Sequence, residues 1–175
     1  MINFTNILYL KRGNSRQQHA YNLLSEYCIF EKLANYQPLL AGTIPINIDL
    51  PTSDLDIICY WKNKEQFKTL LQKEFKQHPK FVLKETLNRN HETIIARFQL
   101  EYFPIEIFGQ NRPSATQEAF RHMLIEHALL EKYGEGFRKQ IIQLKNQGYK
   151  TEPAFAQLLG ITGNPYDELL KLYGE

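Results

Sequence analysis

Two aspartates, Asp54 and Asp56, are separated by one residue at the start of a segment typical of a buried strand, DLDIICY. Side chains alternate between the two faces of an extended strand, so both carboxylates are expected to point the same way. At a rise of ~3.3 Å per residue their Cβ atoms lie roughly 6–7 Å apart, a separation that one or two bridging cations can close. Burying an unpaired carboxylate is costly, so this pair needs a partner.

A third acid has a similar setting, because Glu106 lies between Ile105 and Ile107 in another apolar segment. If the two strands are neighbours, the three carboxylates converge on one point. Acidic oxygens with open coordination positions suit Mg²⁺ or Mn²⁺, which keep some water and complete their shell with substrate phosphates. The residues therefore predict a divalent metal site at Asp54, Asp56 and Glu106.

Gly42 and Thr43 come before the acid pair and suit phosphate binding. A glycine lets a ligand approach the backbone closely, and the Thr43 hydroxyl with neighbouring N–H groups can bind phosphate oxygens. The loop from residue 44 to residue 53 then leads to the aspartate strand. Each signal is weak by itself, since an Asp-x-Asp pair is also common at strand edges and turns. Their combination is more specific.

The elements that position these residues follow from apolar periodicity, turn residues and capping signatures. The helix-start signals are Ser15-x-x-Gln18, Asn63-x-x-Gln66 and Asn164-Pro165, and Asn88-Arg89-Asn90 is typical of a hairpin turn. The predicted helices lie over 15–27, with a possible continuation to 35, from 63 to about 75, over 114–133, from 137 to about 148, from 151 to about 160, and from 164 onward. The predicted strands lie at 39–41, 55–61 and 102–108, and a hairpin is expected at 80–87 and 92–101. These elements predict one α/β (α+β) domain over residues 1–175. A small mixed sheet with flanking helices occupies about 15–110, and a helical C-terminal layer occupies about 114–173.

The composition limits the class of partner. A net charge of +2 is too small to indicate nucleic-acid or membrane binding by electrostatics alone, and 43% apolar residues suit a globular chain. Apolar runs fall short of the ~20 residues of a membrane span, and the N-terminal segment does not read as a signal peptide. Cys28 and Cys59 are predicted to be small buried residues in a reducing compartment. The expected location is the cytoplasm.

Several other polar residues are weaker candidates. Arg121 could reach phosphate, while its neighbour His122 could instead pair with Glu126 on the surface of the helix. Arg89 and His91 could close over a nucleotide, although solvated turn residues are the simpler interpretation. Gln110, Asn111 and Arg112 could contact a base or ribose or could equally form a plain loop. His127 is interpreted as a packing or surface residue, and Tyr102, Phe103 and Phe108 as core aromatics first and a base-stacking platform second.

Gly42-Thr43, then SDLDII from Ser53, and later IEI around Glu106, together resemble the nucleotidyltransferase superfamily. Its signature is Gly-Ser or Gly-Thr, a loop of this length, Asp-hydrophobic-Asp, and a third acid on a later strand. The segments TIPINIDLPTSDLDIIC, PIEIFGQ, AFRHMLIEHALL and KTEPAFAQLLG are similar to one uncharacterised bacterial family of that superfamily, a domain of unknown function. This closer resemblance covers nearly the whole chain and implies a minimal nucleotidyltransferase-like fold.

The resemblance implies that Asp54, Asp56 and Glu106 hold two divalent metals, Mg²⁺ or Mn²⁺, and that Gly42, Thr43 and Ser53 bind the triphosphate. Metals ~3.5–4 Å apart stabilise the attacking and leaving oxygens of an in-line displacement. The implied reaction transfers a nucleoside monophosphate from a nucleoside triphosphate to an unknown acceptor, a small molecule or a protein. Glu106 or Asp56 could also accept the proton.

One departure matters, because small relatives often carry an arginine in the loop after Gly-Ser, where this chain has Ile44-Pro45-Ile46. A basic phosphate contact must then come from elsewhere, or triphosphate binding is weak. Two alternatives remain open: a nucleotide-binding or regulatory module without turnover, and a toxin–antitoxin component that modifies a partner protein.

Overall fold

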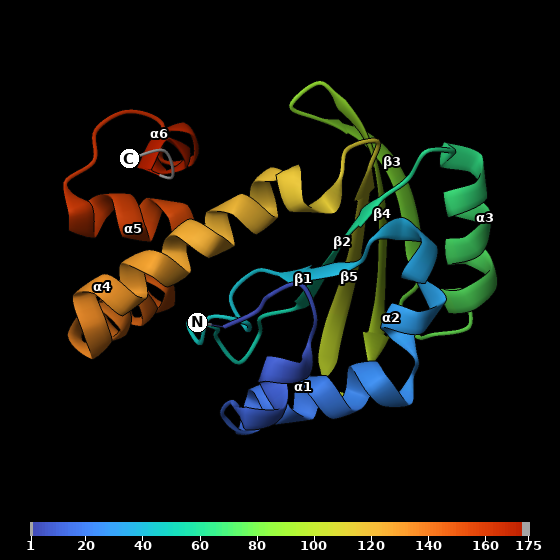
Figure 1. Cartoon of the computed structure of the whole chain (residues 1–175), viewed down its shortest axis with the longest axis horizontal. Helices are drawn as coiled ribbons and strands as arrows, with labels where there is room; N and C mark the ends of the chain where they lie inside the picture. The colour runs from blue at the N-terminus through green and yellow to red at the C-terminus, as the bar shows by residue number, and fades with distance from the viewer. Residues whose placement is uncertain (1, 173–175) are drawn as a thin grey trace.

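The computed structural model, described here for residues 2–172, is built around a five-stranded mixed sheet (Figure 1). In spatial order the strands are β1 (Leu39–Ala41), β2 (Leu55–Tyr60), β5 (Phe103–Gln110), β4 (His91–Leu100) and β3 (Val82–Asn88). Strands β2 and β5 pair in parallel, whereas the other neighbouring pairs are antiparallel. The predicted α/β class and mixed sheet are confirmed.

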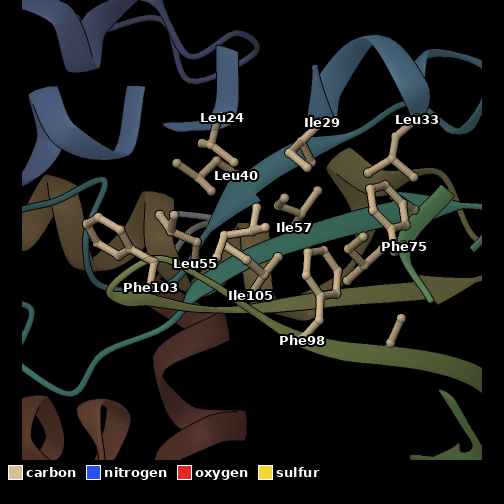
Figure 2. Packing of buried hydrophobic residues seen from close by; sticks show 14 of the residues in the cluster. Leu24, Ile29, Leu33, Leu40, Leu55, Ile57, Phe75, Phe98, Phe103 and Ile105 are labelled. Atoms are coloured by element: carbon tan, nitrogen blue, oxygen red, sulfur yellow. The ribbon is translucent and has the colours of Figure 1, made fainter. Parts of the chain in front are cut away.

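One face of the sheet packs against α1 (Ser15–Glu26), α2 (Ile29–Lys32) and α3 (Lys64–Phe75). Leu24, Ile29 and Leu33 meet strand residues such as Leu40, Leu55, Ile57 and Ile105 in this core (Figure 2). Because β2 is apolar on this face, the alternation of the strand leaves Asp56 on the opposite face.

The N-terminal helix differs in two details from its prediction. Asn14, rather than Ser15, caps α1, since its Oδ1 accepts from Gln17 N at 2.9 Å while Gln17 Oε1 accepts from Asn14 N at 3.0 Å. The helix does not continue to residue 35, because Cys28 adopts a left-handed conformation with φ of 50°. Cys28 is exposed and Cys59 is buried, so the prediction of a buried thiol is wrong for Cys28.

The second layer consists of α4 (Glu118–Asn146), α5 (Thr151–Leu159) and α6 (Pro165–Lys171), which lie across the sheet from α3 (Figure 1). Phe120, Met123 and Phe155 from this layer form a second core with Ala41 and Ile58 of the sheet. The two helices expected here are both present, because the helix labelled α4 is interrupted at Gly134, whose φ of 76° and ψ of −166° lie outside the helical region. Ser114–Thr116 form a separate 3-10 turn before α4, so the predicted start of this helix is four residues early.

The remaining boundaries match their sequence signals. Asn63 Oδ1 caps α3 by accepting from Gln66 N at 3.0 Å, and Asn164 precedes Pro165 at the start of α6. The hairpin of β3 and β4 turns at Arg89 and Asn90. Over residues 2–172, every helix is too short or too polar to cross a membrane.

Candidate functional site

A cavity of about 720 Å³ lies between the second face of the sheet and the C-terminal helices. Asp54, Asp56, Glu106, Gly42, Thr43 and Ser53 all line it, so the structure brings six of the seven sequence-predicted site residues together. The seventh, Arg121, is not among the lining residues and is partly buried elsewhere on α4.

Strand pairing explains why acids distant in the sequence meet. In the parallel pair of β2 and β5, Asp56 lies directly opposite Glu106. Asp54 comes just before β2, two residues from Asp56, and lines the same cavity. The three acids therefore occupy one wall, which we name the sheet wall, although Asp56 and Glu106 are 50 positions apart (106 − 56 = 50).

The backbone at Gly42 lies directly against this acid pair. A Cβ atom added to Gly42 would lie 2.2 Å from Oδ2 of Asp56, and its φ of 80° is left-handed. Only glycine combines this conformation with such a close approach at low cost. The neighbouring Thr43 and Ser53 hydroxyls lie 3.3 Å apart, and Ser53 Oγ accepts from Leu50 N at 2.9 Å. Gly42 thus supports both the turn and the position of Asp56.

The loop between Thr43 and Asp54 is fixed by side chains from distant elements, which the sequence analysis missed. Gln17 donates to the Ile44 and Pro45 carbonyls at 2.9 and 3.1 Å. Arg16 donates to Ser53 O at 3.0 Å and pairs with Asp49 at 2.9 Å. Ile44, Pro45 and Ile46 are buried, so this stretch packs into the protein and does not line the cavity. These contacts leave the loop little freedom to move.

The environment of Asp56 disfavours its charged form. Burial raises its pKa well above the usual range, and the neighbouring Asp54 and Glu106 carboxylates raise it further. The opposing contributions of Arg97 and Lys145 are smaller. Although protein atoms surround the side chain closely, it remains partly accessible from the cavity. A carboxylate in this setting gains from a cation that enters the cavity.

Glu106 already has a cationic partner that the sequence analysis missed. Arg97 of β4 lies opposite Glu106 of β5, and its Nε and Nη2 atoms each lie 2.5 Å from Glu106 Oε2. The tight turn between β4 and β5 sets this register, with Leu100 opposite Phe103. Counting back from that turn along alternating strand residues could have predicted the pair.

The side chains of the sheet wall supply donor atoms that suit a hard divalent cation. Asp54, Asp56 and Glu106 supply only carboxylate oxygens, the ligands that Mg²⁺ prefers. Within residues 2–172, however, no three acidic, histidine or cysteine side chains are gathered tightly enough to ligate one ion together. The aspartates are open to the cavity, whereas Glu106 is held by Arg97.

The opposite wall, which we name the helical wall, comes from α4 and α5 and carries His122, Glu126, Lys145 and Glu152. Burial raises the pKa of Glu126 well above the usual range, and Glu152 adds to this effect. Burial lowers the pKa of Lys145 despite the surrounding acids, and its Nζ donates to Ile48 O at 2.7 Å. This wall therefore places ionisable groups in a desolvated setting.

His122 is buried in this wall, so the expected surface pair with Glu126 is wrong. Its Nε2 lies 2.8 Å from Tyr166 O on α6, and its Nδ1 lies 3.6 Å from Glu152 Oε1. The packing of α5 and α6 over α4 encloses this face of the helix, which helical periodicity alone does not predict. The other histidine of α4, His127, packs edge-on against Phe4 at a ring distance of 4.9 Å.

The mouth of the cavity is bridged by Arg89 at the hairpin turn. Its Nη1 lies 2.7 Å from Asp167 Oδ1 on α6 and 3.2 Å from Glu118 Oε2 on α4. Hence Arg89 links the sheet to both helices. Arg112, Lys145 and Lys150 also line the cavity and supply positive charge.

Some of the other candidate residues line the cavity and others do not. His91, Gln110, Arg112 and Phe108 line the cavity, whereas Asn111 does not. Gln110 is buried and donates to Thr93 Oγ1 at 2.9 Å. Tyr102 is 90% exposed, so its interpretation as a core aromatic is wrong: it lies in the turn between β4 and β5. Its neighbour Phe103 is buried as expected.

Comparison with protein families assigns the chain to one of them. The model of the family described as Domain of unknown function (DUF4269) matches residues 22–172. The chain belongs to this family. A comparison with curated proteins gave no match to this DUF4269 chain.

Solved structures similar to the DUF4269 chain include two that are described as polymerases. The Cid1 poly(U) polymerase with Mg 3′-dATP bound gives a TM-score of 0.57 at 12% identity, covering 89% of this chain and 48% of that one. The GLD-2/RNP-8 complex gives 0.52 at 13% identity, covering 82% and 55%. The polymerase core of TRAMP, an RNA surveillance complex, gives 0.52 at 13% identity, covering 90% and 49%.

These similarities establish a nucleotidyltransferase fold for the DUF4269 chain. It spans about half the length of these three solved chains, between 48% and 55%. The expected fold and the expected membership of a domain of unknown function are thus both confirmed.

Proposed function

We propose that this DUF4269 chain transfers a nucleoside monophosphate from a nucleoside triphosphate to an acceptor in a reaction that depends on Mg²⁺ or Mn²⁺. The observation that carries the proposal is the sheet wall, where Asp54, Asp56 and Glu106 line one cavity beside the Gly42 turn. The neighbour that binds Mg 3′-dATP shares this fold.

Each residue of the sheet wall has a role in the proposal. Asp54 and Asp56, with Glu106, would hold the metal, which when bound supplies positive charge to the phosphates and acidifies the acceptor hydroxyl. The Gly42 turn and the Thr43 and Ser53 hydroxyls would bind phosphate oxygens. The acceptor oxygen bonds to the α-phosphorus, pyrophosphate leaves, and a carboxylate of Asp56 or Glu106 takes the proton.

The source of positive charge for the triphosphate differs from the expected one. Arg121 does not line the cavity, whereas Arg89, Arg112, Lys145 and Lys150 do. These four come from the hairpin turn, the segment after β5, the end of α4 and the connection between α4 and α5. We assign the phosphate contact to this group in place of Arg121 and of the loop at Ile44.

The acceptor in this proposal is a small molecule or a protein. A cavity of about 720 Å³ is within the roughly 300–1,000 Å³ typical of small-molecule sites. A cytoplasmic location, the expected single domain and a toxin–antitoxin role stay predictions.

The test is incubation with each α-³²P-labelled nucleoside triphosphate and Mg²⁺, followed by measurement of pyrophosphate release and of label on the protein or on small molecules from a cell extract. We expect one triphosphate to react and the Asp54→Asn variant to be inactive. Tight nucleotide binding by calorimetry with no turnover for any triphosphate would instead favour the regulatory module. If the protein neither binds nor turns over any triphosphate, both interpretations are wrong.

A further inference from the structure

Directly opposed residues form a row across the cavity face of the sheet. Asp56 on β2, Glu106 on β5 and Arg97 on β4 are successive partners in this row. Glu106 therefore has an acid on one side and a guanidinium on the other. Its position between them allows two different partners for the same carboxylate.

The present partner is Arg97. Both contacts of the guanidinium, from Nε and from Nη2, end on Glu106 Oε2 at 2.5 Å. Charge-assisted bonds of this length occupy the oxygen that they reach. Among residues 2–172, Oε1 receives no hydrogen bond, so one oxygen of Glu106 is committed to Arg97 and the other is free.

The pair is positioned to open easily. The Arg97 side chain is 61% exposed, while that of Glu106 is only 18% exposed. Solvent and salt screen an ion pair with one exposed partner, so its net contribution is small. Arg97 can turn towards water, whereas Glu106 stays opposite Asp56 in either state.

We propose that Arg97 competes with a divalent cation for Glu106, so that Asp54 and Asp56 take the ion first and Glu106 can turn both carboxylate oxygens to the ion only when it leaves Arg97. Arg97 is in this sense a positioning residue that weakens metal binding until nucleotide phosphates add ligands. The inference rests on the proposed metal-dependent transfer for the nature of the ion. It explains why the three acids share a wall without being gathered into one ligand group.

The test is the affinity for Mn²⁺ alone, measured by the electron paramagnetic resonance signal of free Mn²⁺ in titrations of the full chain. Arg97→Gln should bind Mn²⁺ about fivefold or more tightly than wild type, the lower end of typical coupling between linked binding events. Arg97→Lys keeps the charge and loses the planar fork, so it should lie between the two.

Two further variants separate competition from a general charge effect. Arg112→Gln removes a positive charge from the same cavity without touching Glu106, and it should change Mn²⁺ affinity less than Arg97→Gln. In a Glu106→Gln background, Arg97→Gln should lose most of its effect, because the carboxylate for which it competes is gone. Equal gains in both backgrounds would overturn the competition.

The outcomes also distinguish the two proposals. If wild type and Arg97→Gln bind Mn²⁺ equally well, the inference about Arg97 is wrong and the proposed function is untouched. If neither protein binds Mn²⁺ with or without a nucleoside triphosphate, both proposals fail. Should Arg97→Gln not fold, the Arg97→Lys and Glu106→Gln titrations decide, since competition requires Glu106→Gln to remove the difference between arginine and lysine.

Discussion

The two walls of the cavity hold their charges by different physical means. The sheet wall carries Asp54, Asp56 and Glu106 on extended backbone, where alternation and register decide which side chains meet. The helical wall carries Glu126 and Lys145, which are both mostly buried although they come from distant turns of α4. One wall is set by strand pairing, and the other depends on how α5 and α6 pack over α4.

This difference explains what each wall can do. In the sheet wall, burial raises the pKa of Asp56 and the neighbouring acids raise it further, an arrangement that a bound cation would relieve. In the helical wall, the acid and base partly compensate each other, since Lys145 lowers the pKa of Glu126 and Glu126 raises that of Lys145. We therefore expect the sheet wall to respond to metal and the helical wall to respond to pH.

The largest expected effect is on the sheet wall. Asp56→Asn should raise the melting temperature in EDTA, because the asparagine keeps the shape and removes a charge that burial and neighbouring acids disfavour. The same change should remove most of the stabilisation by Mg²⁺ or Mn²⁺. That stabilisation is about 2.7 kcal/mol at a metal concentration a hundredfold above the dissociation constant, if only the folded state binds.

Thermal scans of both proteins, with EDTA and with metal, measure this effect. Asp49→Asn is the matched control, since Asp49 pairs with Arg16 in the loop and does not line the cavity. It should keep the full metal response. If metal shifts neither wild type nor the control, and Asp56→Asn melts lower in EDTA, Asp56 is a structural residue.

The second effect tests the turn that supports the sheet wall. Gly42 and Gly134 both have a left-handed φ, of 80° and 76°, but only a Cβ at Gly42 would meet Asp56. Gly134→Ala should cost about 1–3 kcal/mol of folding stability from the conformation alone, because its φ of 76° with ψ of −166° is a region essentially restricted to glycine. Gly42→Ala should cost more and should also weaken nucleotide binding measured by calorimetry. Equal costs with unchanged binding would remove Gly42 from the site.

The fold could be predicted well because its signals are local. Strand alternation, the caps at Asn63 and Asn164 and the hairpin turn at Arg89-Asn90 are all properties of neighbouring residues. The acid pair is equally local, since alternation alone puts Asp54 and Asp56 on one face. The convergence with Glu106 needed one further assumption, that the two strands are neighbours.

The errors arose where tertiary contacts decide. Cys28 is exposed because a left-handed residue breaks the helix that would have buried it. Tyr102 is exposed because it lies in a tight turn, and His122 is buried because α5 and α6 cover it. Lys145 reaches Ile48, a partner 97 positions away, which periodicity cannot reveal.

A smaller effect concerns the helical wall. Folding raises the pKa of Glu126 above its usual value of 4.5, mainly through burial. The penalty for the ionised form is therefore absent below about pH 4.5 and grows as the pH rises through the folded-state pKa. Glu126→Gln should therefore stabilise the protein at neutral pH, and this gain should vanish in acid.

Chemical denaturation of both proteins at several pH values measures the gain. The control is Glu135→Gln, because Glu135 also lies on α4 but its side chain is 67% exposed. This variant should change the free energy of unfolding by less than about 0.5 kcal/mol at every pH. A loss of stability in Glu126→Gln at neutral pH would mean that attraction to Lys145 outweighs burial.

The smallest effect is expected where the two walls are tied together. Arg89 pairs with Glu118 and Asp167, but all three side chains are between 32% and 48% exposed. Exposed ion pairs typically contribute about 0–1 kcal/mol, so Arg89→Gln should barely change the melting temperature. It should instead speed amide hydrogen exchange at the hairpin turn and at the start of α6, because opening of the mouth no longer breaks both contacts.

Arg121→Gln, outside the cavity, should leave exchange at both places unchanged. A large drop in melting temperature would make Arg89 part of the folded core, and unchanged exchange would show that the walls are held together without it.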